Sequence, residues 1–116
     1  MTNINKLVLA GRLTRDVDTR STAGGVVARI GMAVNRKKKE GDKWVDEATY
    51  VNVTMFGKRA EAFARYHSKG SQCCFPNARL AFNSWEKDGE KRSELYVVAE
   101  DWEFIGSKGS DDNVPF

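Results

Sequence analysis

The sequence predicts an all-β fold, a small five-stranded barrel with one short helix between its third and fourth strands. Two observations predict it. Apolar and polar residues alternate through most of the chain, and only one segment, after residue 57, has helical spacing. With 116 residues, 41% apolar and 30% charged, the chain is long enough for one compact domain but not for two. We therefore expect one domain over residues 1–105, followed by a short flexible linker and acidic tip over residues 106–116.

The first two strands are predicted on either side of the turn signal "STAGG". In "KLVLAGRL", Leu7, Leu9 and Leu13 share one face, and Gly11 between them is typical of a bulge or a sharp bend. In "VVARIGMAV", alternation puts five apolar residues on one face: Val26, Ala28, Ile30, Met32 and Val34.

The third strand is predicted over residues 49–56, after an exposed loop. The segment "NRKKKEGDKWVDEA" is dense in charge and has no period, which is typical of a loop between strands. In "TYVNVTMF" the alternation resumes, so we expect Val51, Val53 and Met55 to face the core.

One helix and two further strands complete the prediction. The segment "KRAEAFARYHSKG" ends in a helix stop at Gly70, and four residues have helical spacing: Ala60, Phe63, Ala64 and His67. A lone histidine on such an apolar stripe is usually a packed residue, so we assign His67 no chemistry. Two extended runs then flank "KDGE", where Asp88-Gly89 favours a hairpin turn. Pro76 must lie at an edge or a bulge, because it cannot donate to a ladder.

The outer face of the third strand carries the main functional signal. Alternation places Tyr50 and Phe56 on the face that should meet solvent, and Lys58 follows shortly after. Bases stack on aromatic rings while Lys and Arg contact phosphates, and together they hold a single nucleic-acid strand without reading its sequence. For either ring alone, burial by the helix or by a subunit interface is an equally good explanation.

Further rings and charges lie beside the two predicted connections. Trp44 follows the basic run "RKKK", which includes Arg36 and Lys38, and Trp85 precedes "KDGE". A solvated loop is the simpler interpretation of a basic run, but its position opposite the third strand favours a binding role.

Composition excludes several function classes. The sequence has one His, no Cys/His set with metal spacing and no phosphate-binding glycine loop, so we expect no enzyme, metal or cofactor. Cys73 and Cys74 are adjacent and would point to opposite faces of a strand, so we expect free thiols in a reducing compartment. We see neither a secretory signal nor a membrane-spanning apolar run, which favours the cytoplasm.

The net charge is unevenly distributed. Of the total of +3, residues 106–116 carry −1, from one Lys and two Asp, which leaves +4 for residues 1–105. A basic body with an acidic tip favours a polyanionic partner for the body.

Four segments in order resemble the bacterial single-stranded DNA-binding protein family: "NINKLVLAGRLTRD", "ATYVNVTMFGKRAEAFARYHSKGSQ", "ELYVVAEDWEFIG" and "SDDNVPF". The resemblance implies an oligonucleotide-binding (OB) Greek-key barrel, assembled as a homotetramer in the cytoplasm, with the nucleoid. It implies non-sequence-specific binding of single-stranded DNA in replication, recombination and repair. It also implies that Tyr50, Phe56 and Trp85 stack on bases and that Lys58 and Lys69 face the DNA.

The last of these segments is similar to the acidic tip through which the family recruits partner proteins. Here the tip comprises Asp111, Asp112, Asn113, Val114, Pro115 and Phe116. Phosphates would repel its two carboxylates, so we expect it to bind replication and repair proteins rather than DNA.

The sequence departs from the family's pattern at three places. The basic run around Lys38 aligns with a common aromatic position, which leaves that contact to Trp44 or to charge alone. The stretch "QCCFPNARL" is one residue longer, with Ala78 where glycine is common, and only "GSKGS" precedes the tip. Two alternatives stay open: an OB-fold adaptor of the replication-restart type that uses its barrel for protein contacts, and a cold-shock type of RNA-binding barrel.

Overall fold

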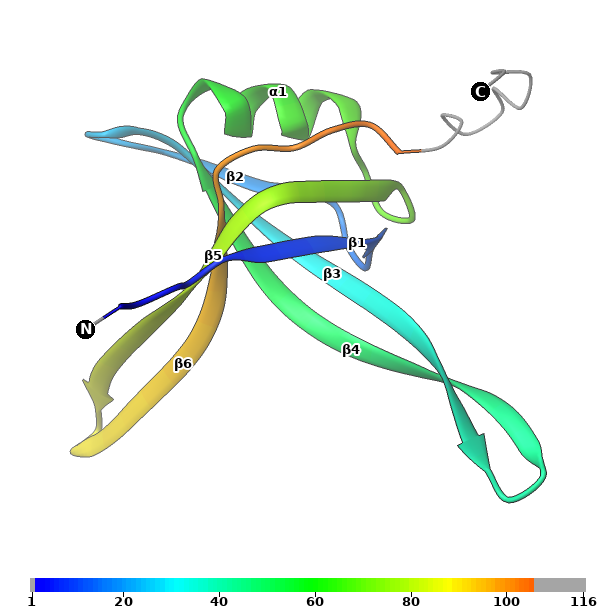
Figure 1. The fold of residues 1–116 in the computed structure, drawn as a ribbon. Coiled ribbons are helices and arrows are strands. Elements are labelled where there is room, and N and C mark those ends of the chain that lie inside the picture. The colour runs from blue at the N-terminus through cyan, green and yellow to red at the C-terminus, as the bar shows by residue number, and fades with distance from the viewer. Residues whose placement is uncertain (1, 106–116) are drawn as a thin grey trace.

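Five of the six strands close into a barrel in the computed structural model, which describes residues 2–105 (Figure 1). The elements are β1 (Leu7–Leu13), β2 (Asp18–Thr22), β3 (Gly25–Glu40), β4 (Lys43–Phe56), α1 (Lys58–Tyr66), β5 (Gln72–Lys87) and β6 (Glu90–Ala99). Around the ring, β1 pairs with β5, β5 with β6, β6 with β4, β4 with β3, and β3 again with β1. The β4–β6 pair is parallel and the other pairs are antiparallel. The predicted five-stranded barrel is confirmed, with β2 added as a sixth strand that pairs only with β3.

The core is built from the residues that alternation assigned to the inner faces. Its largest fully buried side chains are Phe63, Phe75, Leu13, Ile30, Met32, Met55, Val53 and Cys73. Helix α1 lies between β4 and β5 in the chain, as predicted, and it places Phe63 against Phe75 with ring centroids 5.3 Å apart. Because both rings are buried, α1 is fixed to the barrel by packing.

His67 is packed, as the sequence predicted. Only 6% of its surface is exposed, and its ring stacks on Phe63 at 4.0 Å and lies edge-on to Trp102 at 5.3 Å. Its Nδ1 lies 3.0 Å from the carbonyl oxygen of Phe63. The helix itself ends at Tyr66, because His67 already has an extended backbone, so the predicted stop at Gly70 was wrong.

The predicted loop over residues 35–48 was also wrong. β3 continues to Glu40 and β4 begins at Lys43, so these residues form a long hairpin with a two-residue connection. Both faces of this hairpin meet solvent over much of its length, so its sequence shows no alternation of apolar and polar residues. Cross-strand hydrogen bonds and ion pairs hold the two strands together. We call it the β3–β4 arm, and it projects from the barrel in Figure 1.

The second projection, the β5–β6 arm, follows the predicted turn chemistry. Asp88 and Gly89 connect its strands with φ angles of 53° and 80°, which is the positive pair that a type I′ hairpin turn requires. At its base, β5 has one extra residue opposite β1 between Phe75 and Ala78, so Pro76 lies in a bulge, as predicted. Ala78 is buried there and pairs with both Leu7 and Ala99.

The chain after β6 returns to the helix. Trp102 Nε1 donates a hydrogen bond to the carbonyl oxygen of Arg59 at 3.2 Å, and Arg59 forms an ion pair with Asp101. Cys73 and Cys74 are free thiols, as expected. Within residues 2–105, α1 is the only helix, and its nine residues fall far short of a membrane-spanning length.

Candidate nucleic-acid interface

The outer face of β4 carries the two exposed rings that the sequence placed there. Tyr50 is 74% exposed and Phe56 is 55% exposed, while Val53 and Met55 between them are buried. In the register with β3, Phe56 lies opposite Val27, and Thr54 lies opposite Arg29. Burial of either ring by α1 is therefore wrong, and both face solvent in the single chain.

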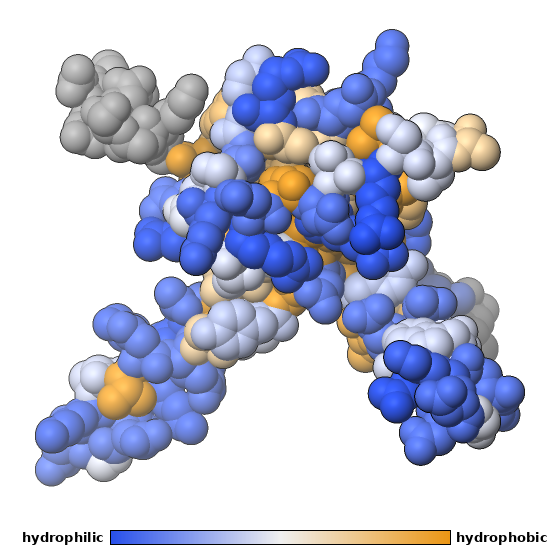
Figure 2. Space-filling view, turned by 180° about the vertical axis from the view of Figure 1, so that it is seen from behind, coloured by the Kyte–Doolittle hydropathy of each residue, from blue (hydrophilic) through white to orange (hydrophobic). Residues whose placement is uncertain are grey.

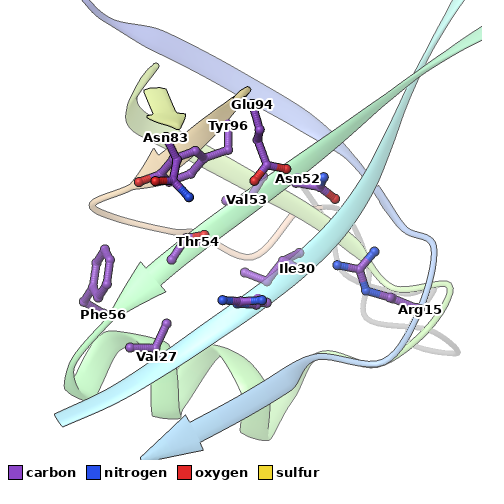
Figure 3. Close-up of a pocket in the computed structure, with 11 residues that line it drawn as sticks. Arg15, Val27, Ile30, Asn52, Val53, Thr54, Phe56, Asn83, Glu94 and Tyr96 are labelled. Carbon is purple, nitrogen blue, oxygen red and sulfur yellow. The ribbon is translucent and has the colours of Figure 1, made fainter. Parts of the chain in front are cut away.

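A cleft of about 330 Å³ runs beside this face, between β3 and β4 on one side and β5 and β6 on the other (Figure 3). Its lining residues are Arg15, Val27, Arg29, Ile30, Asn52, Val53, Thr54, Phe56, Asn83, Glu94 and Tyr96. Figure 3 shows Phe56 and Arg15 at opposite ends of this group. Two aromatic rings, two guanidinium groups and several amide and carboxylate oxygens thus share one surface.

Trp85 continues the same surface along the β5–β6 arm. Asn83 pairs with Glu94 across the arm, and both line the cleft. Trp85 lies two residues beyond Asn83 on the same face of β5, opposite Arg92, and is 42% exposed. The structure therefore brings three predicted ring residues, Tyr50, Phe56 and Trp85, to one connected face.

The two predicted lysines flank this surface without lining the cleft. Lys58 begins α1 directly after Gly57 and is exposed. Lys69 lies in the connection between α1 and β5, where its backbone N–H donates to Asp16 Oδ1 at 2.8 Å. That bond joins the Lys69 connection to the segment that carries Arg15.

The basic residues of the β3–β4 arm occupy both of its faces. Arg36 and Lys38 share Glu47, with Arg36 Nη2 2.7 Å and Lys38 Nζ 3.5 Å from its carboxylate. Trp44 lies opposite Lys39 on the other face and is 65% exposed. At this point of the arm, Arg36 and Lys38 thus lie on the face opposite to Trp44. The arm twists along its length (Figure 1).

The space-filling view in Figure 2 shows the hydropathy of both arms from behind. Each arm is mostly hydrophilic on this side, with a few apolar side chains among the polar ones. This composition fits elements that stay in water when nothing is bound to them.

Several residues of the cleft were not identified from the sequence, among them Arg15, Arg29 and Tyr96. Arg29 could have been found, because it is the polar residue opposite Thr54 once β3 and β4 are paired. Tyr96 lies on the same β6 face as Glu94, two residues further on. Arg15 lies in the connection between β1 and β2, where no periodic pattern assigns a face.

The comparisons with known proteins agree with this geometry. A model of the single-strand binding protein family matches residues 4–105. The chain belongs to this family. Family membership agrees with the expectation of a binding protein rather than an enzyme, and it confirms the resemblance that the sequence segments indicated.

Curated relatives carry the same description. The chain is 36% identical over 108 residues to the "Single-stranded DNA-binding protein" of Treponema pallidum, and 41% identical over 109 residues to that of Wolinella succinogenes. These alignments include 92% and 91% of this chain. They span 61% and 67% of the two relatives' own lengths.

Solved structures confirm the OB fold. The wild-type single-stranded DNA binding protein of Thermus aquaticus superposes with a TM-score of 0.75 at 31% identity, over 91% of this chain and 52% of that one. A Plasmodium falciparum SSB in complex with ssDNA superposes with a TM-score of 0.77 over 90% of this chain and 97% of that one. At 16% identity, the second likeness concerns the fold alone.

Proposed function

We propose that this chain binds single-stranded DNA without sequence specificity, on the outer face of β4, in the adjoining cleft and along the two arms. The observation that carries the proposal is the exposure of Tyr50, Phe56 and Trp85 on one connected face beside cationic groups. Exposed rings are unfavourable in water, and they become favourable where bases can stack on them. The relatives' description as single-stranded DNA-binding proteins supports this assignment.

The chemistry of the face favours stacking and phosphate contact over base recognition. Every base has a flat ring to stack, whereas sequence recognition needs paired donors and acceptors at fixed positions. Replication, recombination and repair are the processes that expose single-stranded DNA. Roles in these processes, in the cytoplasm with the nucleoid, therefore follow from the same proposal.

Alanine substitutions at Phe56 and Trp85 test the proposal. Each should weaken binding of an oligonucleotide by about 1–3 kcal/mol, with similar losses on different sequences, because each removes one stacking surface. Fluorescence anisotropy with oligo(dT) and a mixed-sequence strand measures these losses. Tyr66→Ala is the matched control, because Tyr66 is a ring on α1 with 50% exposure that lies away from the cleft.

A folded double variant with unchanged affinity would exclude this surface. If the wild-type chain binds DNA weakly and with little salt dependence, the adaptor with protein-binding barrel surfaces becomes the better assignment. Tighter binding to RNA than to DNA of the same sequence would favour the cold-shock type of barrel.

The acidic tip adds a second proposed role, the recruitment of replication and repair proteins. Residues Asp111 to Phe116 lie outside the described residues, so the support comes from the sequence: two carboxylates, then Val114, Pro115 and Phe116. An apolar pocket with a basic rim would suit this combination. Deleting Val114–Phe116 should abolish binding to such partners and leave DNA affinity equal or slightly higher. Unchanged partner binding would exclude the tip.

Assembly into a homotetramer is the third part of the proposal. Before it reaches β3 at Arg12, β1 has one edge paired with β5, and no strand within residues 2–105 pairs with its other edge. Val8 on this strand is 66% exposed. An open strand edge with apolar side chains favours pairing with a second copy.

A further inference from the structure

Arg15 lies over the backbone of β3 at a position where only glycine leaves room for it. A Cβ atom added to Gly31 would lie 2.3 Å from Arg15 Nη1, 2.7 Å from Thr14 Oγ1 and 2.9 Å from Arg15 Cζ. Gly31 is buried in the middle of β3, and its partner on β4 is Asn52, which lines the cleft. The missing side chain at Gly31 therefore provides the space in which the guanidinium rests.

Hydrogen bonds on both sides fix the segment that carries Arg15. The backbone N–H of Thr14 donates to the carbonyl oxygen of Gly31 at 2.9 Å. The carboxylate of Asp16 accepts from the backbone N–H of Lys69 at 2.8 Å. Arg15 is thus held between two anchored neighbours, so little backbone entropy of this segment remains to be lost when a ligand binds its guanidinium.

The charges of the cleft are arranged asymmetrically. Among the ion pairs found within residues 2–105, none involves Arg15 or Arg29. Both guanidinium groups are therefore available to bind an anion. The opposite wall carries Glu94 together with the ring of Tyr96. A phosphate would be attracted to the wall with Arg15 and Arg29 and repelled by Glu94 on the opposite wall. A base could stack on Tyr96 or form hydrogen bonds on that opposite wall.

We propose that Arg15 binds a phosphate of the DNA strand and that Gly31 sets its position. With Arg29, it holds the sugar–phosphate backbone on the β3 side of the cleft, so the bases point toward Tyr96 and Phe56. This inference rests on the proposed binding of single-stranded DNA, and it adds the path of the strand and two residues that determine it.

The test uses a cycle of two substitutions. Arg15→Ala should weaken binding of oligo(dT) about tenfold, since a hydrogen bond to a charged group is lost, and should lower the salt slope by about 0.7. Gly31→Ala should have a similar effect, because its Cβ would displace the flexible end of the arginine side chain and push against the hydroxyl of Thr14. The double variant should bind no more weakly than either single variant.

Arg65→Ala is the matched control, because Arg65 is an exposed arginine in the last turn of α1 and does not line the cleft. If Arg15→Ala and Arg65→Ala weaken binding equally, net charge explains the loss and the inference is wrong. In that case the losses at Phe56 and Trp85 still support the proposed function. If the binding losses of Arg15→Ala and Gly31→Ala add in the double variant, Gly31 does not position the guanidinium.

Arg15→Lys provides a second measurement that does not depend on how Gly31→Ala folds. Lysine keeps the charge but lacks the forked donors, so the salt slope should return toward the wild-type value while affinity stays reduced. If Arg15→Lys binds DNA as weakly as Arg15→Ala and has the same lowered salt slope, phosphate binding at this position is contradicted.

Discussion

At the scale of single residues, the buried histidine links the packing of the domain to pH. The His67 ring packs against the rings of Phe63, Trp102 and Phe104. Burial lowers the pKa of His67 below its ordinary value, against the smaller opposing effect of its hydrogen bond to Phe63. The neutral ring is thus the form that the folded domain favours.

We predict that the domain loses stability as the pH falls through the range in which this histidine titrates. In the unfolded chain the imidazole titrates near its ordinary pKa of about 6.5. Its folded pKa is lower, so the unfolded state binds more protons between the two values. The stabilising contribution of neutral His67 is therefore fully present above about pH 6.5 and decreases below it.

Urea unfolding at several pH values between about 7.5 and 5.5 measures this effect, since His67 is the chain's only histidine. His67→Phe is the control: it keeps a stacked ring but does not titrate, so its midpoint should vary less over this range. Equal pH dependence in the two proteins would assign the effect to other groups.

Arg15 shows why part of the site cannot be predicted from single residues. Its position depends on Gly31, which is distant in sequence and becomes its neighbour only when β1 pairs with β3. Tyr50 and Phe56, in contrast, were predicted because alternation within one strand suffices to assign their face.

At the scale of elements, the two arms differ from the barrel strands that continue into them. Val53 and Met55 alternate with exposed residues because one face of β4 is buried there, and this alternation made the strand predictable. Beyond Tyr50 toward the tip of the arm, no core covers either face, so charge replaces the apolar pattern. A hairpin in solvent and a loop then have similar sequences, which explains the wrong loop prediction.

The β3–β4 arm gives a prediction about its own ion pairs. Glu47 neutralises Arg36 and Lys38, yet surface ion pairs contribute only about 0–1 kcal/mol, so phosphates can compete for the two cations. Glu47→Gln should therefore tighten binding of single-stranded DNA at low salt and steepen its salt dependence, with little change in stability.

Glu61→Gln is the control for that prediction, because it removes the same charge from an exposed position on α1. Salt titrations of both variants, followed by anisotropy, separate the local effect from net charge. Equal behaviour of the two variants would mean that DNA does not reach Arg36 and Lys38.

At the scale of the whole molecule, the barrel offers two separate surfaces for self-association. One is the open edge of β1 with Val8. The other is an apolar patch on the β5–β6 arm, on the face opposite Trp85, formed by Leu80, Phe82 and Leu95. These three side chains are 44%, 64% and 67% exposed, and Phe82 lies directly opposite Leu95.

Two independent interfaces are what a tetramer with twofold symmetries requires. One isologous contact yields a dimer, and a second contact on a different surface joins two dimers. The exposed patch also stands apart from the cleft, so copies that meet there leave the rings of β4 free for DNA. The apolar patch thus gives the proposed homotetramer a physical basis that the sequence pattern alone did not provide.

We predict that Phe82→Ser with Leu95→Ser reduces the assembly by one step, from tetramer to dimer, and that Val8→Lys at the β1 edge does the same through the other interface. Combining all three changes should give a monomer, because both contacts are then lost. Light scattering at micromolar concentration measures the mass of each form.

The Trp85→Ala variant is the control, since Trp85 lies on the other face of the same arm and its substitution should leave the mass unchanged. A wild-type chain that is monomeric under these conditions would refute the tetramer, and a patch variant with unchanged mass would exclude the patch as a contact.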